Sequence, residues 1–203
     1  MALAKELWTA NSDWADRILG HGFVRGLHDG SLPVASFKGY VAQDAYFLEA
    51  FARAYAFCLA NSTARQDLYD FAELIGGVLG ELKLHKTYAE RWKVDLSSVT
   101  PIAATQAYVG FLLTNARRGN LGDTIAAMTP CMRLYAWLGQ TLHAMEVEPL
   151  YAEWVNAYAD PGFEALAERL EELLNRHASD SDSVRANYRR AMELEYGFFD
   201  ANL

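Results

Sequence analysis

Residues 34–61 read VASFKGYVAQDAYFLEAFARAYAFCLAN, and this stretch decides the fold class. Pro33 stands at its start, and no residue inside it except Gly39 disfavours a helix. Its apolar side chains recur at intervals of three and four residues, which is the spacing of one helix face. The face that is predicted to be buried carries Tyr40, Phe47, Leu48 and Phe51. The pattern therefore predicts one long helix over 34–61.

The same periodicity recurs along the rest of the chain. It predicts helices over 4–19, up to about 28, and over 64–93, 102–118, 123–145, 149–158, 161–177 and 184–200. Pro130 lies inside 123–145, where a proline kinks or breaks a helix. No segment alternates between apolar and polar residues over a useful length. We therefore predict an all-α, multi-helix bundle that forms one domain over 1–203.

Composition narrows the partners that the chain can have. It carries 18 Lys and Arg against 26 Asp and Glu, a formal net charge of −8, which repels nucleic-acid phosphates and anionic lipid surfaces. No apolar stretch is long enough to span a membrane, and the N-terminus lacks the apolar core of a signal peptide. Two cysteines do not amount to a disulfide framework. We expect a cytoplasmic protein that binds neither nucleic acid nor membrane.

Asp44 is a polar residue in an apolar position. It lies four residues after Tyr40, on the face of 34–61 that is predicted to be buried. A buried carboxylate is costly unless it is paired or hydrogen-bonded. Two interpretations stay open: a structural hydrogen bond, for example to Arg53 or to a helix end, and a contact with a ligand.

Cys131 occupies a similar position in the predicted helix over 123–145. It lies one turn before Tyr135 on an apolar stripe. A lone buried cysteine is usually a small hydrophobic residue, and Cys58 is interpreted in this way. If Pro130 begins a new helical segment, Cys131 lies in its first turn, where the positive end of the helix dipole lowers the pKa of a thiol.

Glu195 is the third polar residue on an apolar face, which it shares with Tyr188, Met192 and Phe199. Aromatic surroundings raise the pKa of a glutamate, which suits a proton donor and acceptor near neutral pH. A buried thiol and two buried carboxylates indicate a nucleophile and an acid–base pair in an enclosed small-molecule site.

Glu81 and His85 are four residues apart and could bind a metal ion. A di-iron bundle needs Glu-x-x-His units on two helices, and this chain has none. We therefore interpret Glu81 and His85 as a surface or packing pair, and we expect no metal and no cofactor.

Several segments carry a resemblance to a known family. They are Leu7-Trp8, 37–54 (FKGYVAQDAYFLEAFARA), 81–86 (ELKLHK), 107–113, 129–139 (TPCMRLYAWLG), 154–158 and 195–200 (EYGFFD). In this order the Gln-Asp dipeptide, the Pro-Cys dipeptide and the Glu-Tyr-x-Phe-aromatic ending are specific together. The chain resembles the thiaminase II (TenA) family, whose members have the haem-oxygenase-like helical fold, and Cys131 places it with the cysteine-bearing branch.

The resemblance implies hydrolysis of 4-amino-5-aminomethyl-2-methylpyrimidine to the hydroxymethyl compound in thiamin salvage, and in some members cleavage of thiamin. It implies that Cys131 adds to the pyrimidine ring, that Glu195 shuttles protons to the ring nitrogen and to water, and that Asp44 binds the amino group. It also implies a homotetramer. The remaining pocket residues that it implies are Tyr108, Tyr135 and Tyr158, with two residues that stack on the ring, Phe47 and Phe198.

Three departures from the family pattern bear on substrate preference. Met132 and Arg133 follow the Pro-Cys pair, where family members often have Trp. Phe47 stands where Tyr is common, and Phe199 replaces a common Trp.

Two other functions stay open. One is a cofactor-less oxidase that resembles the pyrroloquinoline quinone synthase relatives, which surround an anionic substrate with His and Arg. The other is a transcriptional regulator without enzymatic activity, and the acidic charge and the missing recognition helix argue against direct DNA binding.

Overall fold

The computed structural model describes residues 2–145 and 148–203. Over these residues the chain forms ten α-helices and no β-strand, so the predicted all-α class is confirmed. The helices are α1 (Leu3–Ala10), α2 (Ser12–Leu19), α3 (Gly22–Asp29), α4 (Val34–Asn61), α5 (Arg65–Trp92), α6 (Ala103–Arg118), α7 (Leu121–His143), α8 (Ala152–Ala159), α9 (Pro161–His177) and α10 (Asp182–Ala201). Within the described ranges, none of them combines the length and the apolar character that crossing a bilayer requires.

The predicted helix over 4–19 is two helices, because Asn11 interrupts it. The backbone of Asn11 has φ −118° and ψ 15°, and its side-chain Nδ2 donates to the carbonyl oxygen of Leu7 at 2.8 Å. A short amide side chain competes with the helix for backbone hydrogen bonds in this way. The prediction of one continuous helix was therefore wrong at this point.

Helix α7 continues through Pro130, so of the two predicted alternatives, a kink and a break, the break does not occur. Residues 124–132 are all buried, and the helices packed around this stretch hold it in the helical conformation. In the turn before the proline, the Thr129 hydroxyl donates to the carbonyl oxygen of Ile125 at 2.8 Å. Tertiary packing here outweighs the local preference of proline.

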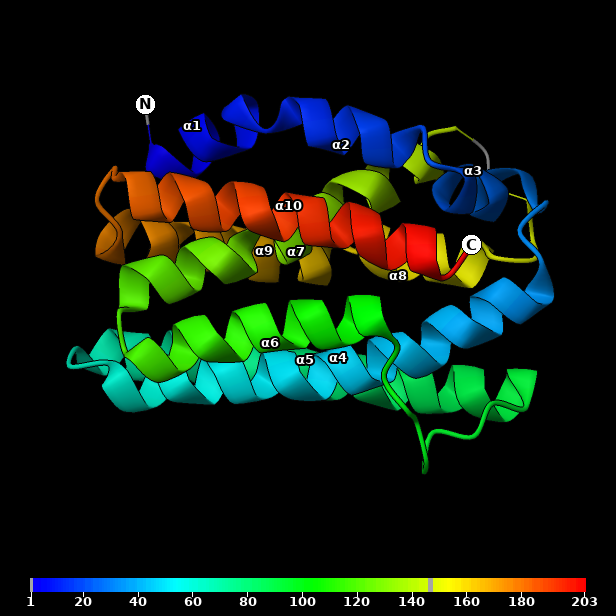
Figure 1. The fold of residues 1–203 in the computed structure, drawn as a ribbon, viewed down its shortest axis with the longest axis horizontal. Coiled ribbons are helices and arrows are strands. Elements are labelled where there is room, and N and C mark those ends of the chain that lie inside the picture. Colours follow the sequence, from blue (N-terminus) through cyan, green and yellow to red (C-terminus); the bar gives the residue numbers. More distant parts are fainter. Residues whose placement is uncertain (1, 146–147) are drawn as a thin grey trace.

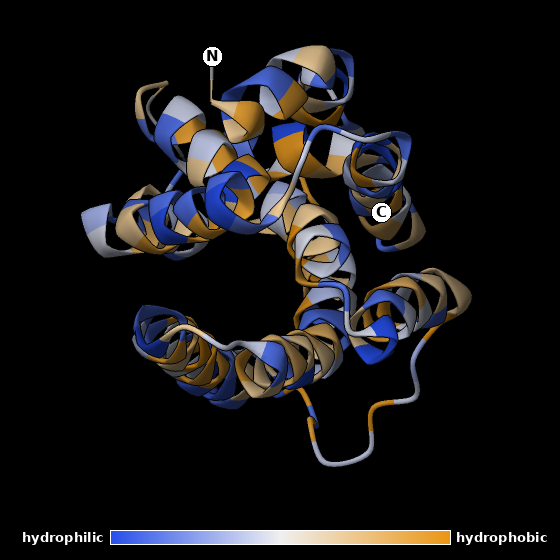
Figure 2. Cartoon of the chain, turned by 90° about the vertical axis from the view of Figure 1, so that its left-hand side faces the viewer, coloured by the Kyte–Doolittle hydropathy of each residue, from blue (hydrophilic) through white to orange (hydrophobic). Residues whose placement is uncertain are grey.

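The helices form two layers (Figure 1). Helices α4, α5 and α6 make up the lower layer, and α7 to α10 lie above them with α1, α2 and α3 on the outside. Helix α7 packs against α8, α9 and α10, and it also contacts α4 and α6 across the boundary between the layers. Figure 2 looks along the long axis and shows both groups of helices end-on.

Gly139 allows α8 to lie directly against α7. A Cβ atom at this position would lie 2.4 Å from the backbone carbonyl carbon of Tyr158, a distance that no side chain tolerates. The close approach brings the rings of Tyr135 and Tyr158 to a centroid distance of 4.8 Å. Glycine at this position therefore places two aromatic residues at the boundary between the layers.

Candidate active site

A small cavity lies between the two layers. Its walls come from α4, α5, α7, α8 and α9 and consist of Asp44, Phe47, Leu48, Phe51, Glu81, Cys131, Met132, Tyr135, Tyr158 and Phe163. The volume is about 10 Å³, close to what a single water molecule needs. Of the wall residues only Glu81 and Phe163 are not buried. A flat ring therefore enters only if side chains of the wall move.

Cys131 and Glu195 are close enough for each side chain to shift the pKa of the other. The Tyr108 hydroxyl donates to Glu195 Oε1 at 2.7 Å. Burial raises the pKa of Glu195 to about 8, although Tyr108 and Cys131 oppose the shift. The predicted rise in this pKa is thus confirmed in direction.

The thiol of Cys131 has a raised pKa, not a lowered one. Burial raises it well above its usual range, and the nearby carboxylate of Glu195 adds to the effect. Since α7 continues through Pro130, Cys131 lies inside a helix and not in a first turn. The condition under which a helix dipole would lower this pKa, a helical segment that begins at Pro130, is therefore not met.

Asp44 pairs with His85 and not with Arg53 or a helix end. Asp44 Oδ2 lies 2.7 Å from His85 Nε2, and His85 Nδ1 lies 3.1 Å from the backbone oxygen of Glu81. Burial disfavours a charge on His85, but the Asp44 carboxylate outweighs burial and raises the pKa of His85 to about 9. Arg53 instead pairs with Glu49 on the surface.

Glu81 belongs to the cavity, although sequence analysis interpreted it as part of a surface or packing pair. Its Oε1 accepts a hydrogen bond from the Tyr158 hydroxyl at 2.6 Å. Burial and the neighbouring Asp44 carboxylate raise the pKa of Glu81 to about 7. The i, i+4 spacing of Glu81 and His85 was the available signal. Their partner Asp44 is about forty residues away, so this spacing alone did not reveal the site.

Asp44, Glu81 and His85 are close enough to share a metal ion, since one ligand atom from each lies within 4.8 Å of the others. However, the two ring nitrogens of His85 already face oxygen atoms, and its raised pKa favours the doubly protonated ring. A metal ligand must be neutral imidazole. These residues therefore suit an ion pair better than a metal centre.

The aromatic residues named by the resemblance divide into two groups. Phe47, Tyr135 and Tyr158 line the cavity. Tyr108 and Phe198 lie behind Phe47, with ring centroids 4.6 Å and 6.0 Å from it. The cavity lining that sequence analysis did not anticipate consists of Leu48, Phe51, Glu81, Met132 and Phe163.

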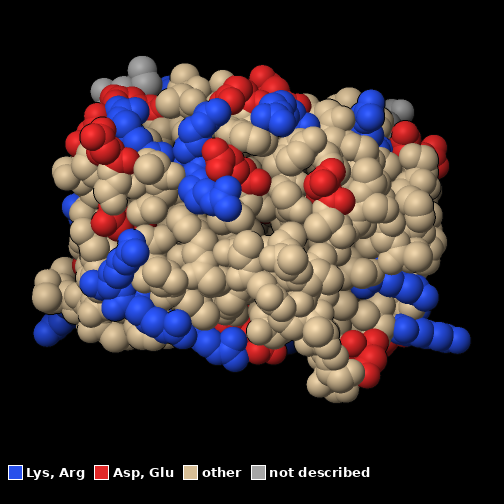
Figure 3. Space-filling view, in the orientation of Figure 1, with Lys and Arg blue, Asp and Glu red and all other residues tan. Residues whose placement is uncertain are grey.

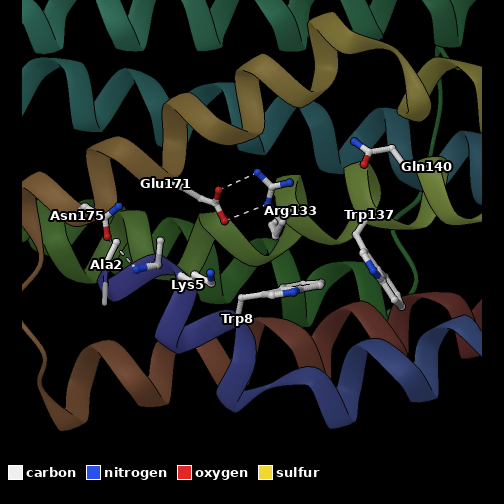
Figure 4. Close-up of a pocket in the computed structure, with 9 residues that line it drawn as sticks. Ala2, Lys5, Trp8, Arg133, Trp137, Gln140, Glu171 and Asn175 are labelled. Atoms are coloured by element: carbon white, nitrogen blue, oxygen red, sulfur yellow. Dashed lines mark hydrogen bonds and ion pairs between the residues drawn. The ribbon is translucent and has the colours of Figure 1, made fainter.

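Met132 and Arg133, the two residues after Cys131, point to different places. Met132 lines the cavity, whereas Arg133 faces a groove of about 370 Å³ between α1, α7 and α9 (Figure 4). The guanidinium of Arg133 donates to Glu164 at 2.7 Å and to Glu171 at 2.7 and 3.0 Å. Its charge is thus balanced by two carboxylates, and of this pair only Met132 can affect a ligand in the cavity.

The cavity combines the parts that covalent hydrolysis requires. A thiol can add to an electron-poor ring, and the adjacent Glu195 can take its proton and pass it on. The hydrogen-bonded carboxylate of Asp44 can bind an amino group or an amidine edge. The narrow, mostly apolar walls keep bulk water from reactive intermediates.

Comparison with known proteins shows the family to which the chain is similar. The model of the TENA/THI-4/PQQC family matches residues 8–203. The chain is 33% identical over 187 residues to the aminopyrimidine aminohydrolase of Halalkalibacterium halodurans, and the match covers 89% of this chain and 80% of that protein.

Two further proteins extend the comparison. The bifunctional TH2 protein, mitochondrial, of Arabidopsis thaliana is 31% identical over 207 residues; the match covers 88% of this chain and 34% of the plant protein, so the chain spans about a third of that relative. The crystal structure of a TenA family transcription regulator from Silicibacter sp. TM1040 superposes with a TM-score of 0.91 at 25% identity, and 98% of this chain and 95% of that chain are covered. The haem-oxygenase-like fold that the resemblance implied is confirmed.

Proposed function

This chain belongs to the TENA/THI-4/PQQC family, and from that membership we propose that it is an aminopyrimidine aminohydrolase of thiamin salvage. It hydrolyses 4-amino-5-aminomethyl-2-methylpyrimidine to the hydroxymethylpyrimidine and ammonia. The observation that carries the proposal is the cavity that Asp44 and Cys131 line together, with Glu195 close enough to the thiol to shift its pKa.

Cys131 is the nucleophile of the proposed reaction. Its sulfur bonds to a ring carbon while Glu195 takes the thiol proton and delivers it to a ring nitrogen. The ring loses its aromaticity, and its electrons then expel the protonated amine from the 5-methylene carbon as ammonia. The ring N–H proton passes back to Glu195, and water adds to the exposed methylene carbon and gives its proton to the released ammonia. When the sulfur departs, Glu195 returns its proton to the thiolate, which restores the aromatic ring and the free thiol.

Asp44 orients the substrate. His85 occupies Oδ2 of Asp44 at 2.7 Å, which leaves Oδ1 to accept a hydrogen bond from the 4-amino group. A carboxylate held in one place by a buried partner loses little freedom when the substrate binds. Phe47 and Tyr135 supply the flat apolar surfaces against which the ring packs.

The oxidase alternative fits the cavity less well. An anionic substrate needs positive charge around it, whereas this cavity has Asp44 and Glu81 in its walls and Glu195 directly behind Cys131. A neutral or cationic pyrimidine suits these carboxyl groups better.

The proposal is tested by the variant Cys131→Ser. We expect ammonia release from the aminomethylpyrimidine to fall by about a thousandfold or more, because an alcohol is a far weaker nucleophile than a thiol. Cys58→Ser is the matched control: Cys58 is also buried but lies outside the cavity, so this variant should keep nearly full activity. Activity retained by Cys131→Ser would refute the nucleophile.

We also propose a cytoplasmic homotetramer. Both cysteines are free, as a reducing compartment requires of a catalytic thiol. The face in Figure 3 has a broad region without charged side chains between α10 and α6. Such a region can be covered by another copy of the chain. Sedimentation equilibrium should give about four times the chain mass of 22.7 kDa, and a monomer at micromolar concentration would contradict the assembly.

A further inference from the structure

Glu81 lies between the cavity and a second hollow on the outer surface. This outer hollow has a volume of about 170 Å³ and is lined by Gly80, Glu81, Leu84, Ala157, Tyr158 and Phe163. Glu81, Tyr158 and Phe163 line both spaces. We call these three shared residues the partition between the two spaces. Because Glu81 and Phe163 are the cavity residues that are not buried, the partition is the most exposed part of the cavity wall.

The charged groups at this partition are two carboxylates, Asp44 and Glu81, and one cation, His85, so one negative charge is not balanced. Asp44 and His85 balance each other across 2.7 Å. Glu81 accepts a hydrogen bond from Tyr158, and a hydroxyl carries no charge. Asp44 and Glu81 together have one cation beside them, His85, so the pair of carboxylates attracts a further positive charge. The partition is therefore suited to a positively charged group.

The geometry of the proposed substrate directs one particular group to Glu81. In the pyrimidine ring the 4-amino and 5-aminomethyl groups are on neighbouring carbons, and ring nitrogen N1 is opposite carbon 4. If Asp44 binds the 4-amino group and Glu195 faces N1, a residue beside Asp44 faces one of the two ring neighbours of carbon 4, which are N3 and the carbon that bears the 5-substituent. Of these two sides, the 5-substituent is the one with the positive charge that a carboxylate attracts. Glu81 is a residue beside Asp44, because its carboxylate lies within 4.8 Å of the polar atoms of Asp44 and His85.

We infer that Glu81 binds the positively charged group on the 5-methylene carbon, and that the outer hollow receives this group when it leaves. The inference rests on the proposed function and specifies its substrates as aminopyrimidines with a cationic 5-substituent. That substituent is an ammonium in the aminomethyl compound and a thiazolium in thiamin. The ammonium fits beside Glu81, and the larger ring extends into the hollow between α5 and α8.

The charge on the leaving group changes during the reaction. When the C–N bond breaks, its electron pair stays with nitrogen, so an ammonium departs as ammonia and a thiazolium as a neutral thiazole. The positive charge passes to the pyrimidine ring, which releases its N–H proton to Glu195. Glu81 therefore holds the group before cleavage and loses its electrostatic attraction afterwards.

Binding of two pyrimidines that differ in charge tests the role of Glu81. Dissociation constants of the aminomethyl and hydroxymethyl compounds are measured by calorimetry on Cys131→Ser protein, which leaves the substrate intact. We expect Glu81→Gln to weaken binding of the cation by about tenfold or more, and to change binding of the neutral compound by less than about twofold. Glu153→Gln removes the same charge from the surface of α8 and should leave both constants unchanged.

The outcomes separate this inference from the proposed function. If neither pyrimidine binds to the Cys131→Ser protein, the proposed function fails. If both bind and Glu81→Gln weakens them equally or not at all, the assignment of Glu81 fails alone. Glu81→Asp keeps the charge and should keep most of the preference for the cation, so a loss of preference here too would point to a disturbed fold and overturn the assignment.

The outer hollow is tested with a larger side chain in its wall. Gly80 is exposed, lines the hollow, and has nothing within 4 Å of an added Cβ atom, so Gly80→Leu places an apolar side chain in the wall of the hollow. We expect this variant to weaken binding of thiamin by about tenfold and binding of the aminomethylpyrimidine by less than about twofold. Gly76→Leu, equally open and one turn away, is the control. Equal effects on both ligands, or no thiamin binding to any form, would overturn the role of the hollow.

Discussion

Glu195 determines the pH at which the proposed reaction runs. Burial raises its pKa to about 8 while the Cys131 thiol titrates higher still, so only the ionised form of Glu195 can take the thiol proton. We predict that kcat/KM rises about tenfold for each pH unit below 8 and levels off above it. Ammonia release between pH 6 and pH 9 measures this profile, and a profile that falls over this range would contradict the assignment.

The variant Glu195→Gln isolates this proton transfer. The amide still accepts a hydrogen bond from Tyr108 but cannot accept a proton. We predict that kcat/KM falls by about a hundredfold or more and that the rise near pH 8 disappears. Glu193→Gln, on the same helix and paired with Arg190, serves as the control. An unchanged pH profile in Glu195→Gln would assign the titration to another group.

His85 acts through Asp44 and is a positioning residue. His85→Asn removes the cation that holds Asp44, and breaking a buried pair lowers the free energy of unfolding by about 3 kcal/mol. We predict that KM for the aminomethylpyrimidine rises about tenfold while kcat changes little, because the substrate meets a carboxylate that is no longer fixed. Steady-state kinetics separates the two constants. A stability loss with an unchanged KM would show that His85 is only structural.

At the residue scale, the sequence revealed polar residues on apolar stripes and missed residues whose partners are distant. Asp44, Cys131 and Glu195 stood out because helical spacing assigns their positions to the core, and the structure brings them together. Glu81 and His85 looked like an ordinary pair because local spacing does not show that α4 faces them. Periodicity describes one helix at a time.

At the element scale, the contact between α7 and α8 depends on Gly139. We predict that Gly139→Ala lowers the free energy of unfolding by about 1–3 kcal/mol and reduces activity, because the added methyl group pushes Tyr158 away from the cavity. Gly110→Ala is the control: its Cβ meets nothing within 4 Å, so it should stabilise α6 by about 0.5–1 kcal/mol. Urea denaturation measures both. A neutral Gly139→Ala would show that α8 is free to shift.

The helices themselves were largely predictable, and the two exceptions have a common cause. The bounds of α4 and α9 agree with the predicted 34–61 and 161–177, where Pro33 precedes the periodic stretch of α4 and the Asp160 side chain caps α9. The interruption at Asn11 was missed, and the choice between a kink and a break at Pro130 could not be made, because the effect of both residues depends on what surrounds them. Asn11 bonds to its own backbone, whereas Pro130 is held in place by the helices packed around α7.

For the whole molecule, the buried groups of the site make stability depend on pH. In the folded protein the pKa values of Glu81, Glu195 and His85 are raised to about 7, 8 and 9. The folded state therefore binds more protons than the unfolded state between about pH 5 and pH 9, and stability falls as pH rises through this range.

The size of this effect can be measured directly. Within this pH range, each buried group with a raised pKa lowers the free energy of unfolding by up to about 1.4 kcal/mol for every pH unit. We predict that the urea midpoint decreases from pH 5 to pH 9 and that Glu195→Gln makes the decrease shallower. A midpoint that rises with pH would contradict the raised pKa values.

Periodicity alone could not predict how the helices are arranged in space. The cavity needs side chains from α4, α5, α7, α8 and α9, and the order in which these helices pack is set by long-range contacts such as the one at Gly139. Only the family resemblance linked the segments before the structure was known.

The raised pKa of the Cys131 thiol has a consequence outside the reaction itself. Peroxides and alkylating agents attack the thiolate, and they must reach it through the aqueous phase. A sulfur that stays protonated behind walls with room for about one water molecule reacts slowly with both. We therefore expect the proposed nucleophile to stay intact during oxidative stress and to react only with a molecule that can open the walls.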